Sequence, residues 1–214
     1  EDEVQRAFDL SSGPLVRLTL LRLGRDEHLA MLGMHHIVAD GWSILVLVRE
    51  LTSLYAAFYQ GTSSPLPELP VQYADYALCQ RRWLQGDVLA ADLDFWLGTL
   101  EDAPRVLELP ADRPRPAVPS GRGGARAARL SPALASALTA FGRGEGSTLF
   151  MTLLAAWNTL LFRVSEQKDL VVGIPIANRN RLEIEGLVGF FTNTLALRTR
   201  LTAGKRFLDL ARDI

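Results

Sequence analysis

The chain has 214 residues, of which 48% are hydrophobic and 22% are charged, a composition typical of globular proteins. Its net charge of -1 gives no reason to expect nucleic acid or a membrane as a partner. The single cysteine, Cys79, excludes an intramolecular disulfide and a cysteine-rich metal site, and it fits a reducing, cytoplasmic setting. The chain starts at Glu1 without Met and stops at Ile214 inside a helical pattern, so we interpret it as an internal piece of a longer protein.

The first predicted elements are two strands, residues 15–23 and 28–36, which a polar turn joins into an antiparallel hairpin. After Gly41 the apolar residues fall at helical spacing, which predicts an amphipathic helix. The histidines His35 and His36 are therefore predicted at a junction between a strand and a helix, which is a common place for catalytic groups.

A stretch rich in proline and glycine is predicted to divide the chain. Between Pro104 and Gly124 there are five prolines, three glycines and four arginines. No regular element tolerates this composition. We therefore predict a linker at residues 108–124, between a partial N-terminal lobe at residues 1–107 and a partial C-terminal lobe at residues 125–214.

The remaining predicted elements alternate between helices and strands, which favours an α/β or α+β fold class. Ser131 and Pro132 suit the N-cap and the first position of a helix, and Ser147 or Thr148 suits the N-cap of the next one. In chain order the predicted elements are helices at 71–85 and 87–100, a short strand at 124–130, helices at 131–141 and 147–164, a strand at 169–176, a polar loop at 177–185, a strand at 190–201 and the start of a helix at 205–214.

The sequence His35-His36-Ile37-Val38-Ala39-Asp40-Gly41 is the strongest candidate for chemistry, because it holds two of the three histidines in the chain. An imidazole titrates near neutral pH, so it can take up a proton and return it. Adjacent residues of a strand point to opposite faces, so at most one of the two rings faces a given cavity. Asp40 could hold that ring or pin the loop by pairing elsewhere. Gly41 would give room for a ligand or allow a positive φ.

Readings besides catalysis stay open for each candidate residue at this point. The histidines could be hydrogen-bonded core groups, whereas a metal site is disfavoured because a further ligand is missing. Asn193, inside an apolar strand pattern, could bond a neighbouring backbone edge. Arg179, just past a predicted buried strand, could offer a bidentate fork to a carboxylate such as Asp40, or lie in solvent. Phosphate-binding glycine motifs are missing from the sequence, so nucleotide binding is unsupported.

Three motifs, taken together, resemble the condensation domain of nonribosomal peptide synthetases. Residues 34–43 (MHHIVADGWS) are similar to that family's HHxxxDG motif with its WS extension, residues 73–77 (YADYA) to its YxDYA motif, and residues 188–198 (VGFFTNTLALR) to its (I/V)GxFVNT motif. Thr192 stands where that third motif commonly has valine. The three motifs follow the family's order, whereas HHxxxDG alone is shared with CoA-dependent acyltransferases.

The resemblance implies a two-lobed fold like that of chloramphenicol acetyltransferase, truncated here at both ends. His36 would be the catalytic group and face a tunnel between the lobes, with His35 as its structural support. Asp40 would be held by Arg179, and Gly41 would give the backbone room near a thioester. The residues that the resemblance places along the substrate channel are Trp42, Ser43 and Asn193.

The implied activity is formation of a peptide (amide) bond between aminoacyl or peptidyl thioesters. The phosphopantetheine arms of an upstream and a downstream peptidyl carrier protein would deliver these thioesters, and no cofactor bound by the domain itself is implied. An adenylation domain of the same synthetase is the further partner implied. Because the tunnel needs both complete lobes, activity of this piece alone is not implied.

Three alternative functions remain within reach of the same motifs. An epimerization domain shares HHxxxDG and the two-lobed fold, although the WS extension and VGFFTNT favour condensation. A CoA-dependent acyltransferase is disfavoured by YADYA and GFFTNT. A condensation-like module that only docks partners is disfavoured by the intact histidine pair.

Overall fold

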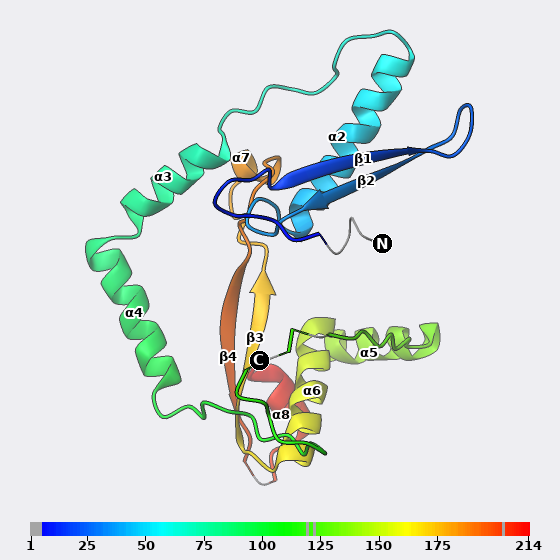
Figure 1. The fold of residues 1–214 in the computed structure, drawn as a ribbon. Coiled ribbons are helices and arrows are strands. Elements are labelled where there is room, and N and C mark those ends of the chain that lie inside the picture. Colours follow the sequence, from blue (N-terminus) through cyan, green and yellow to red (C-terminus); the bar gives the residue numbers. More distant parts are fainter. Residues whose placement is uncertain (1–5, 119, 122, 203) are drawn as a thin grey trace. The chain divides into compact units, whose positions relative to one another are not determined.

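The protein is described from a computed structural model that covers residues 6–118, 120–121, 123–202 and 204–214. Its elements run in chain order from strand β1 to helix α8 (Figure 1). The chain divides into two compact units, and each consists of two separate stretches. The first comprises Glu1–Ala91 and Pro175–Thr194, and the second comprises Asp92–Ile174 and Leu195–Ile214.

The first unit begins with the predicted hairpin. Its strands β1 (Val16–Arg22) and β2 (His28–Met34) pair in antiparallel register, with Val16 opposite Met34. Backbone bonding continues one residue further, because the His35 amide donates to the Leu15 carbonyl at 3.0 Å. The helices of this unit are α2 (Gly41–Tyr59), α3 (Tyr73–Trp83), the start of α4 (Gly86–Leu100) and the short α7 (Leu182–Glu185).

The core of the first unit joins α3 to the segment that follows α7. Ile184, Leu187 and Phe191 are buried there. Tyr73 and Tyr76 of α3 pack against them, with ring centroids 5.1 and 4.7 Å from that of Phe191. Two motifs that are more than a hundred residues apart in the sequence therefore share one apolar cluster.

The second unit contains the predicted helices α5 (Pro132–Gly144) and α6 (Leu149–Ser165), which meet at 103°, and α8 (Phe207–Arg212). Both predicted N-caps are confirmed. The hydroxyl of Ser131 accepts from the amide of Leu134, and that of Thr148 accepts from the amide of Met151, each at 3.2 Å. The core of this unit is formed by Ala155, Leu210 and Ala211, with Leu201 and Ile214 against it.

Strands β3 (Asp169–Ile176) and β4 (Asn193–Arg200) pair as a separate two-stranded sheet and contribute residues to both units. The bounds of β3 are those predicted from its apolar run. The strand predicted at 190–201 begins later, at Asn193. Side chains from other segments bind backbone groups at the start of this range, because Tyr73 donates to the Phe190 carbonyl and Asp40 accepts from the Phe191 amide.

Three further predictions about local structure are wrong in detail. Residues 124–130 form no strand, since they contain no β-branched residue and no partner strand lies beside them among the described residues. The loop at 177–185 contains α7. Strand β2 ends at Met34, so His35 and His36 lie in the turn beyond it instead of on the strand.

The proline-rich stretch has neither helix nor strand among its described residues, 108–118, 120–121 and 123–124. It lies wholly within the second compact unit, and the units divide elsewhere, at Ala91, Ile174 and Thr194. The partial lobes predicted at 1–107 and 125–214, with a linker at 108–124 between them, stay a prediction.

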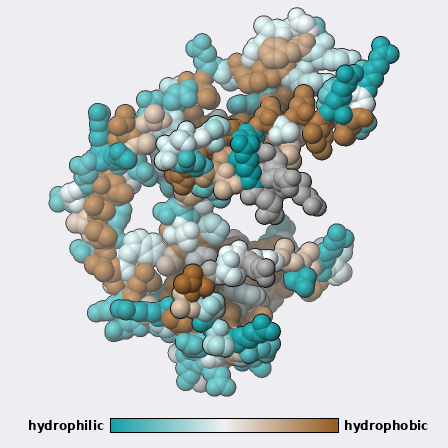
Figure 2. All heavy atoms as spheres, viewed as in Figure 1, coloured by the Kyte–Doolittle hydropathy of each residue, from teal (hydrophilic) through white to brown (hydrophobic). Residues whose placement is uncertain are grey.

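Many large apolar side chains are exposed, and α2 shows this most clearly. Leu45 is 70% and Phe58 is 61% exposed, and Figure 2 shows hydrophobic residues on the surface over α2 and along α4. By length and composition α2 could span a membrane. Its centre carries Arg49 and Glu50, however, and its first turn belongs to a buried polar network. We therefore interpret α2 as a helix of a folded domain.

Candidate active site

The two histidines lie side by side in the turn after β2 but have different surroundings. His35 is half-buried, and its Nδ1 accepts a hydrogen bond from the Ile37 amide at 3.1 Å. Its ring meets that of Phe8 at 77°, with centroids 5.9 Å apart. In a neutral His35 the proton is therefore on Nε2, because Nδ1 is the acceptor. These contacts fix the His35 side chain within the turn.

His36 is exposed, and its ring contacts Phe190 in a T-shaped arrangement, with centroids 5.1 Å apart and planes at 85°. Within the part of the chain that the structure describes, neither ring nitrogen of His36 has a hydrogen-bond partner. The ring is thus held by an aromatic contact, and among the described residues both nitrogens are left without a hydrogen bond to the protein. This is the property expected of a group that exchanges a proton with a substrate.

Asp40 follows the turn and is the N-cap of α2. Its Oδ1 accepts from both the amide and the hydroxyl of Ser43, each at 2.8 Å. Its Oδ2 accepts from the amide of Phe191 at 3.0 Å. Asp40 does not contact either imidazole, so of the two possibilities left open by the sequence, pairing elsewhere is the one observed.

The ion pair between Asp40 and Arg179 is present, with Nη2 and Oδ1 at 3.1 Å and both side chains fully buried. Of the two possibilities left open for Arg179, the pairing with Asp40 is the one observed, although not as a bidentate fork. Arg179 uses only Nη2 for the carboxylate, and its Nη1 donates to the carbonyls of Ile184 and Leu187 at 2.7 and 2.8 Å. Its guanidinium also lies over the Phe191 ring, 4.0 Å from the centroid. Arg179 therefore fixes the α7 segment and the Asp40 turn at once.

Burial alone would raise the pKa of Asp40, but hydrogen bonds outweigh it. The Ser43 amide and hydroxyl, the Phe191 amide and the Arg179 guanidinium all favour the ionised carboxylate and lower the pKa from 3.8 to about 2. Asp40 is therefore a permanent anion at neutral pH. Such a group cannot serve as a proton acceptor there, whereas it can serve as a fixed electrostatic and hydrogen-bonding centre.

Ser43 connects this turn to the third motif. Its fully buried hydroxyl lies 2.8 Å from the Gly189 carbonyl and accepts from the Gly189 amide at 3.0 Å. Arg179 Nη2 also donates to it, at 3.0 Å. The hydroxyl of Ser43 is thus buried within the network. Its place along a substrate channel stays a prediction.

The remaining candidate residues lie around this network. Gly41, the first residue of α2, does not have a positive φ, and a Cβ built there meets nothing within 4 Å. The open space beside Gly41 is consistent with the close approach of a ligand. The other possibility, that this glycine allows a positive φ, is excluded. Trp42 is 39% exposed and donates its indole N–H to the Glu185 carbonyl at 2.9 Å. Asn193 is exposed, and its Oδ1 accepts from the Thr194 amide at 2.8 Å.

Sequence reasoning missed two members of the site, Tyr73 and Phe190. The Tyr73 hydroxyl donates to the Phe190 carbonyl at 2.8 Å, and the Phe190 ring is the contact of His36. Both residues lie in motifs that the sequence singled out. The pattern predicted packing for Tyr73, and nothing in it indicated the long-range hydrogen bond.

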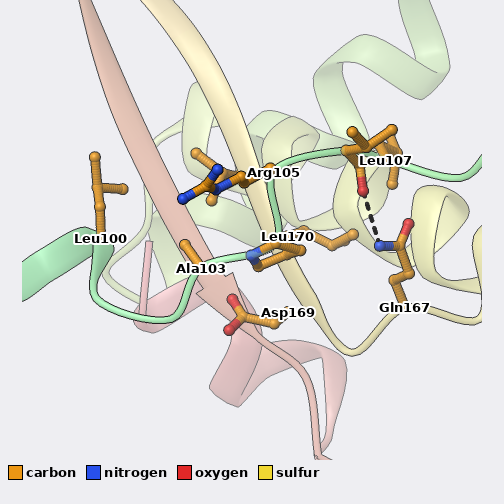
Figure 3. Close-up of a pocket in the computed structure, with 10 residues that line it drawn as sticks. Leu100, Ala103, Arg105, Leu107, Gln167, Asp169 and Leu170 are labelled. Carbon is orange, nitrogen blue, oxygen red and sulfur yellow. Dashed lines mark hydrogen bonds between the residues drawn. The ribbon is translucent and has the colours of Figure 1, made fainter.

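A cavity of about 400 Å³ in the second unit is not part of this site (Figure 3). It lies between the loop after α4 and the start of β3, where Gln167 pins the loop by donating to the Val106 carbonyl at 3.0 Å and accepting from the Glu108 amide at 2.7 Å. Its lining contains no histidine, and among the described residues no three His, Cys, Asp or Glu side chains gather as metal ligands.

The chain belongs to the condensation domain family, whose model matches residues 1–214. It is 52% identical over 209 residues to one subunit of linear gramicidin synthase from Brevibacillus parabrevis, a match covering 98% of this chain and 3% of that protein. Among solved structures it resembles the X-domain from teicoplanin biosynthesis, with a TM-score of 0.89, 30% identity and coverage of 99% of this chain and 48% of that one.

A four-domain nonribosomal peptide synthetase bound to AMP and glycine, AB3403, also contains this fold. The TM-score is 0.83 at 28% identity, over 100% of this chain and 16% of that one. These matches confirm both the predicted family and the predicted fold class, a mixed helix and strand fold of the condensation type that is truncated in this chain. The chain spans only a small part of its synthetase relatives, 3% of the gramicidin synthase protein.

Proposed function

We propose that the complete domain from which this chain comes forms peptide bonds between thioesters carried on two partner proteins. The amine of the acceptor attacks the donor thioester carbonyl, a C–N bond forms, the C–S bond breaks, and the amine proton ends on the departing thiolate. The observation that carries the proposal is the exposed His36 ring, with neither nitrogen engaged, in a family whose members include peptide synthetases.

His36 has two ways to accelerate this reaction. It can accept the proton as the amine attacks, or it can orient the amine and stabilise the tetrahedral intermediate. A thioester is already activated, so positioning supplies much of the rate. Both roles need one ring nitrogen directed at the substrate, and His35, whose Nδ1 is already engaged with Ile37, is less suited to it.

The surrounding site residues divide into support and channel. Asp40, Ser43 and Arg179 form the buried support that holds the histidine turn against the third motif. Gly41 and Asn193 remain the candidates for contact with the substrate, because both are exposed. We assign Trp42 to the rim of the site, since its indole N–H is engaged with Glu185 while its ring is partly exposed.

The proposed partners follow from the reaction. The two thioesters arrive on phosphopantetheine arms of an upstream and a downstream peptidyl carrier protein, and an adenylation domain loads the acceptor. The similarity to a four-domain synthetase and to a gramicidin synthase protein supports this setting. The proposed location of the parent synthetase is the cytoplasm.

The test is dipeptide formation by the intact synthetase module with both carriers loaded. We expect His36→Ala to lower the rate of product formation by about a hundredfold or more, because general acid–base and positioning roles of a single group reach this size. The matched control is His28→Ala, an exposed histidine at the start of β2 that should leave the rate unchanged. Unchanged product formation in His36→Ala rejects the assignment.

A docking role has a specific observation in its favour. A solved relative of the same fold is the X-domain in complex with OxyB, so condensation-like folds also bind partner proteins. If docking were the role of this chain, loaded carriers would give no amide product, and His36→Ala would leave the binding of the partner protein unchanged. In the same assay, inversion of a carrier-bound aminoacyl group would identify an epimerization domain, and acyl transfer from free CoA would identify a CoA-dependent acyltransferase.

A further inference from the structure

Tyr73, from the second motif, makes an unusually close contact with the third motif. Its ring covers Gly189 so tightly that a Cβ built on Gly189 would lie 2.2 Å from a ring carbon. Its hydroxyl donates to the carbonyl of the next residue, Phe190, at 2.8 Å. Only glycine at position 189 allows both contacts, because any side chain there would displace the Tyr73 ring.

The backbone around Phe190 is held on both sides. On one side the Gly189 amide and carbonyl both contact the Ser43 hydroxyl, at 3.0 and 2.8 Å. On the opposite side the Phe191 amide donates to Asp40 Oδ2 at 3.0 Å. Together with Tyr73, these bonds occupy polar groups of three consecutive residues. The Phe190 side chain is therefore directed by its backbone, although it is itself 40% exposed.

The Phe190 ring is directed at His36. The two rings are nearly perpendicular, at 85°, with centroids 5.1 Å apart, which is a favoured geometry for aromatic pairs. His36 has no further ring contact or hydrogen bond among the described residues. An exposed imidazole without such a neighbour would turn freely about its side-chain bonds.

We propose that Tyr73 and Phe190 form a brace that positions the His36 imidazole, a role that rests on the proposed condensation reaction. Tyr73 fixes the Phe190 backbone, and the Phe190 ring limits the orientations of His36. The YADYA motif thus acts on the histidine motif through the intervening aromatic ring. Both brace residues are positioning residues, since neither needs to touch the reacting atoms.

The kinetic test uses the intact synthetase with loaded carriers. Phe190→Leu should lower kcat about tenfold and leave KM within about twofold, because small misplacement of a reacting group affects the chemical step most. Tyr73→Phe, which removes only the hydroxyl, should lower kcat about threefold by the same reasoning. Since both act along one path, the double variant should be no slower than Phe190→Leu alone.

Tyr76→Phe is the matched control. Tyr76 lies on the same helix and packs on Phe191, but its hydroxyl interacts with Gln80 and not with Phe190. It should leave kcat unchanged. Equal effects of Tyr73→Phe and Tyr76→Phe, or a double variant in which the two losses multiply, would overturn the brace.

A second measurement reports on His36 without any condensation. Diethyl pyrocarbonate modifies accessible unprotonated imidazoles, and peptide mass spectrometry gives the rate at each histidine of the intact synthetase. Phe190→Leu should raise the rate at His36 severalfold, because loss of the Phe190 ring leaves more of the imidazole open to the reagent, and should leave the rate at His28 unchanged. An unchanged His36 rate overturns the brace. Absence of amide product in the wild type would reject the proposed function instead. The modification rates would still test whether Phe190 positions His36.

Discussion

Two carboxylate–guanidinium pairs, one in each compact unit, differ in how far water reaches them. Asp40 and Arg179 in the first unit are 3.1 Å apart with both side chains fully buried. Asp169 and Arg198 in the second unit are 2.6 Å apart, but the Asp169 side chain is 28% exposed. Asp169 has a second cationic neighbour, Arg200, at 3.6 Å.

The two pairs also hold different kinds of structure together. Arg198 donates to the carbonyls of Thr99 and Glu101 at 2.9 and 2.6 Å, so its pair fastens the end of α4 to the β3–β4 sheet. The Asp40 pair joins the histidine turn to the segment that carries Phe190 and Phe191. A buried pair is costly to break because a lone charge remains, whereas a pair near water is replaced by solvent. The candidate active site thus depends on the buried pair, Asp40 and Arg179, which is the more costly of the two pairs to break.

Removal of Arg179 should give the largest effect. In the complete condensation domain we expect Arg179→Ala to lower the free energy of unfolding by about 3–5 kcal/mol, because Asp40 is left as an unpaired buried charge. Urea denaturation at pH 7 measures the change. Arg181→Ala is the matched control, since Arg181 is exposed and its side chain does not cap α7. A loss no greater than that of the control would contradict the contrast between the two pairs.

The next largest effect should come from lowering the pH, which changes the contribution of Asp40 to the free energy of unfolding. The folded-state pKa of Asp40 is about 2, below its ordinary 3.8, so its stabilisation is present above pH 4 and is lost as the pH falls through 2. The difference in free energy of unfolding between the wild type and Asp40→Asn should therefore shrink by about 2 kcal/mol between pH 7 and pH 2. Denaturant titrations at both pH values measure it. A difference that is constant with pH would show that the folded-state pKa of Asp40 is not lowered.

Local signals were enough to predict most of the framework. The apolar run of β3 gave both of its ends, and Ser131 and Thr148 cap the helices that their positions predicted, because an N-cap is satisfied by atoms three residues away. The resemblance to a family predicted the contact between Asp40 and Arg179, which lie 139 residues apart.

The rest of the site depends on contacts that no local pattern contains. Ser43 and Gly189 are 146 residues apart, and Tyr73 and Phe190 are 117 apart. Such bonds replace strand pairing in the third motif, which is why β4 begins at Asn193 and not three residues earlier. Alternation of apolar residues cannot distinguish a backbone bound by another strand from one bound by side chains.

The smallest effect should come from the pair in the second unit. Arg198 lowers the pKa of Asp169 by hydrogen bonding, yet the carboxylate is partly open to water. We expect Asp169→Asn to lower the free energy of unfolding by about 1 kcal/mol at low salt, because a partly exposed pair gains little over its solvated partners.

Sodium chloride at high concentration should reduce this loss and leave the effect of Arg179→Ala unchanged, since salt screens exposed charges far more than buried ones. Asp213→Asn is the control and should lower the free energy of unfolding by less still, because the Asp213 side chain in its pair with Lys205 is 57% exposed. A salt-independent loss at Asp169 as large as that at Arg179 would show that burial is not what separates the two pairs.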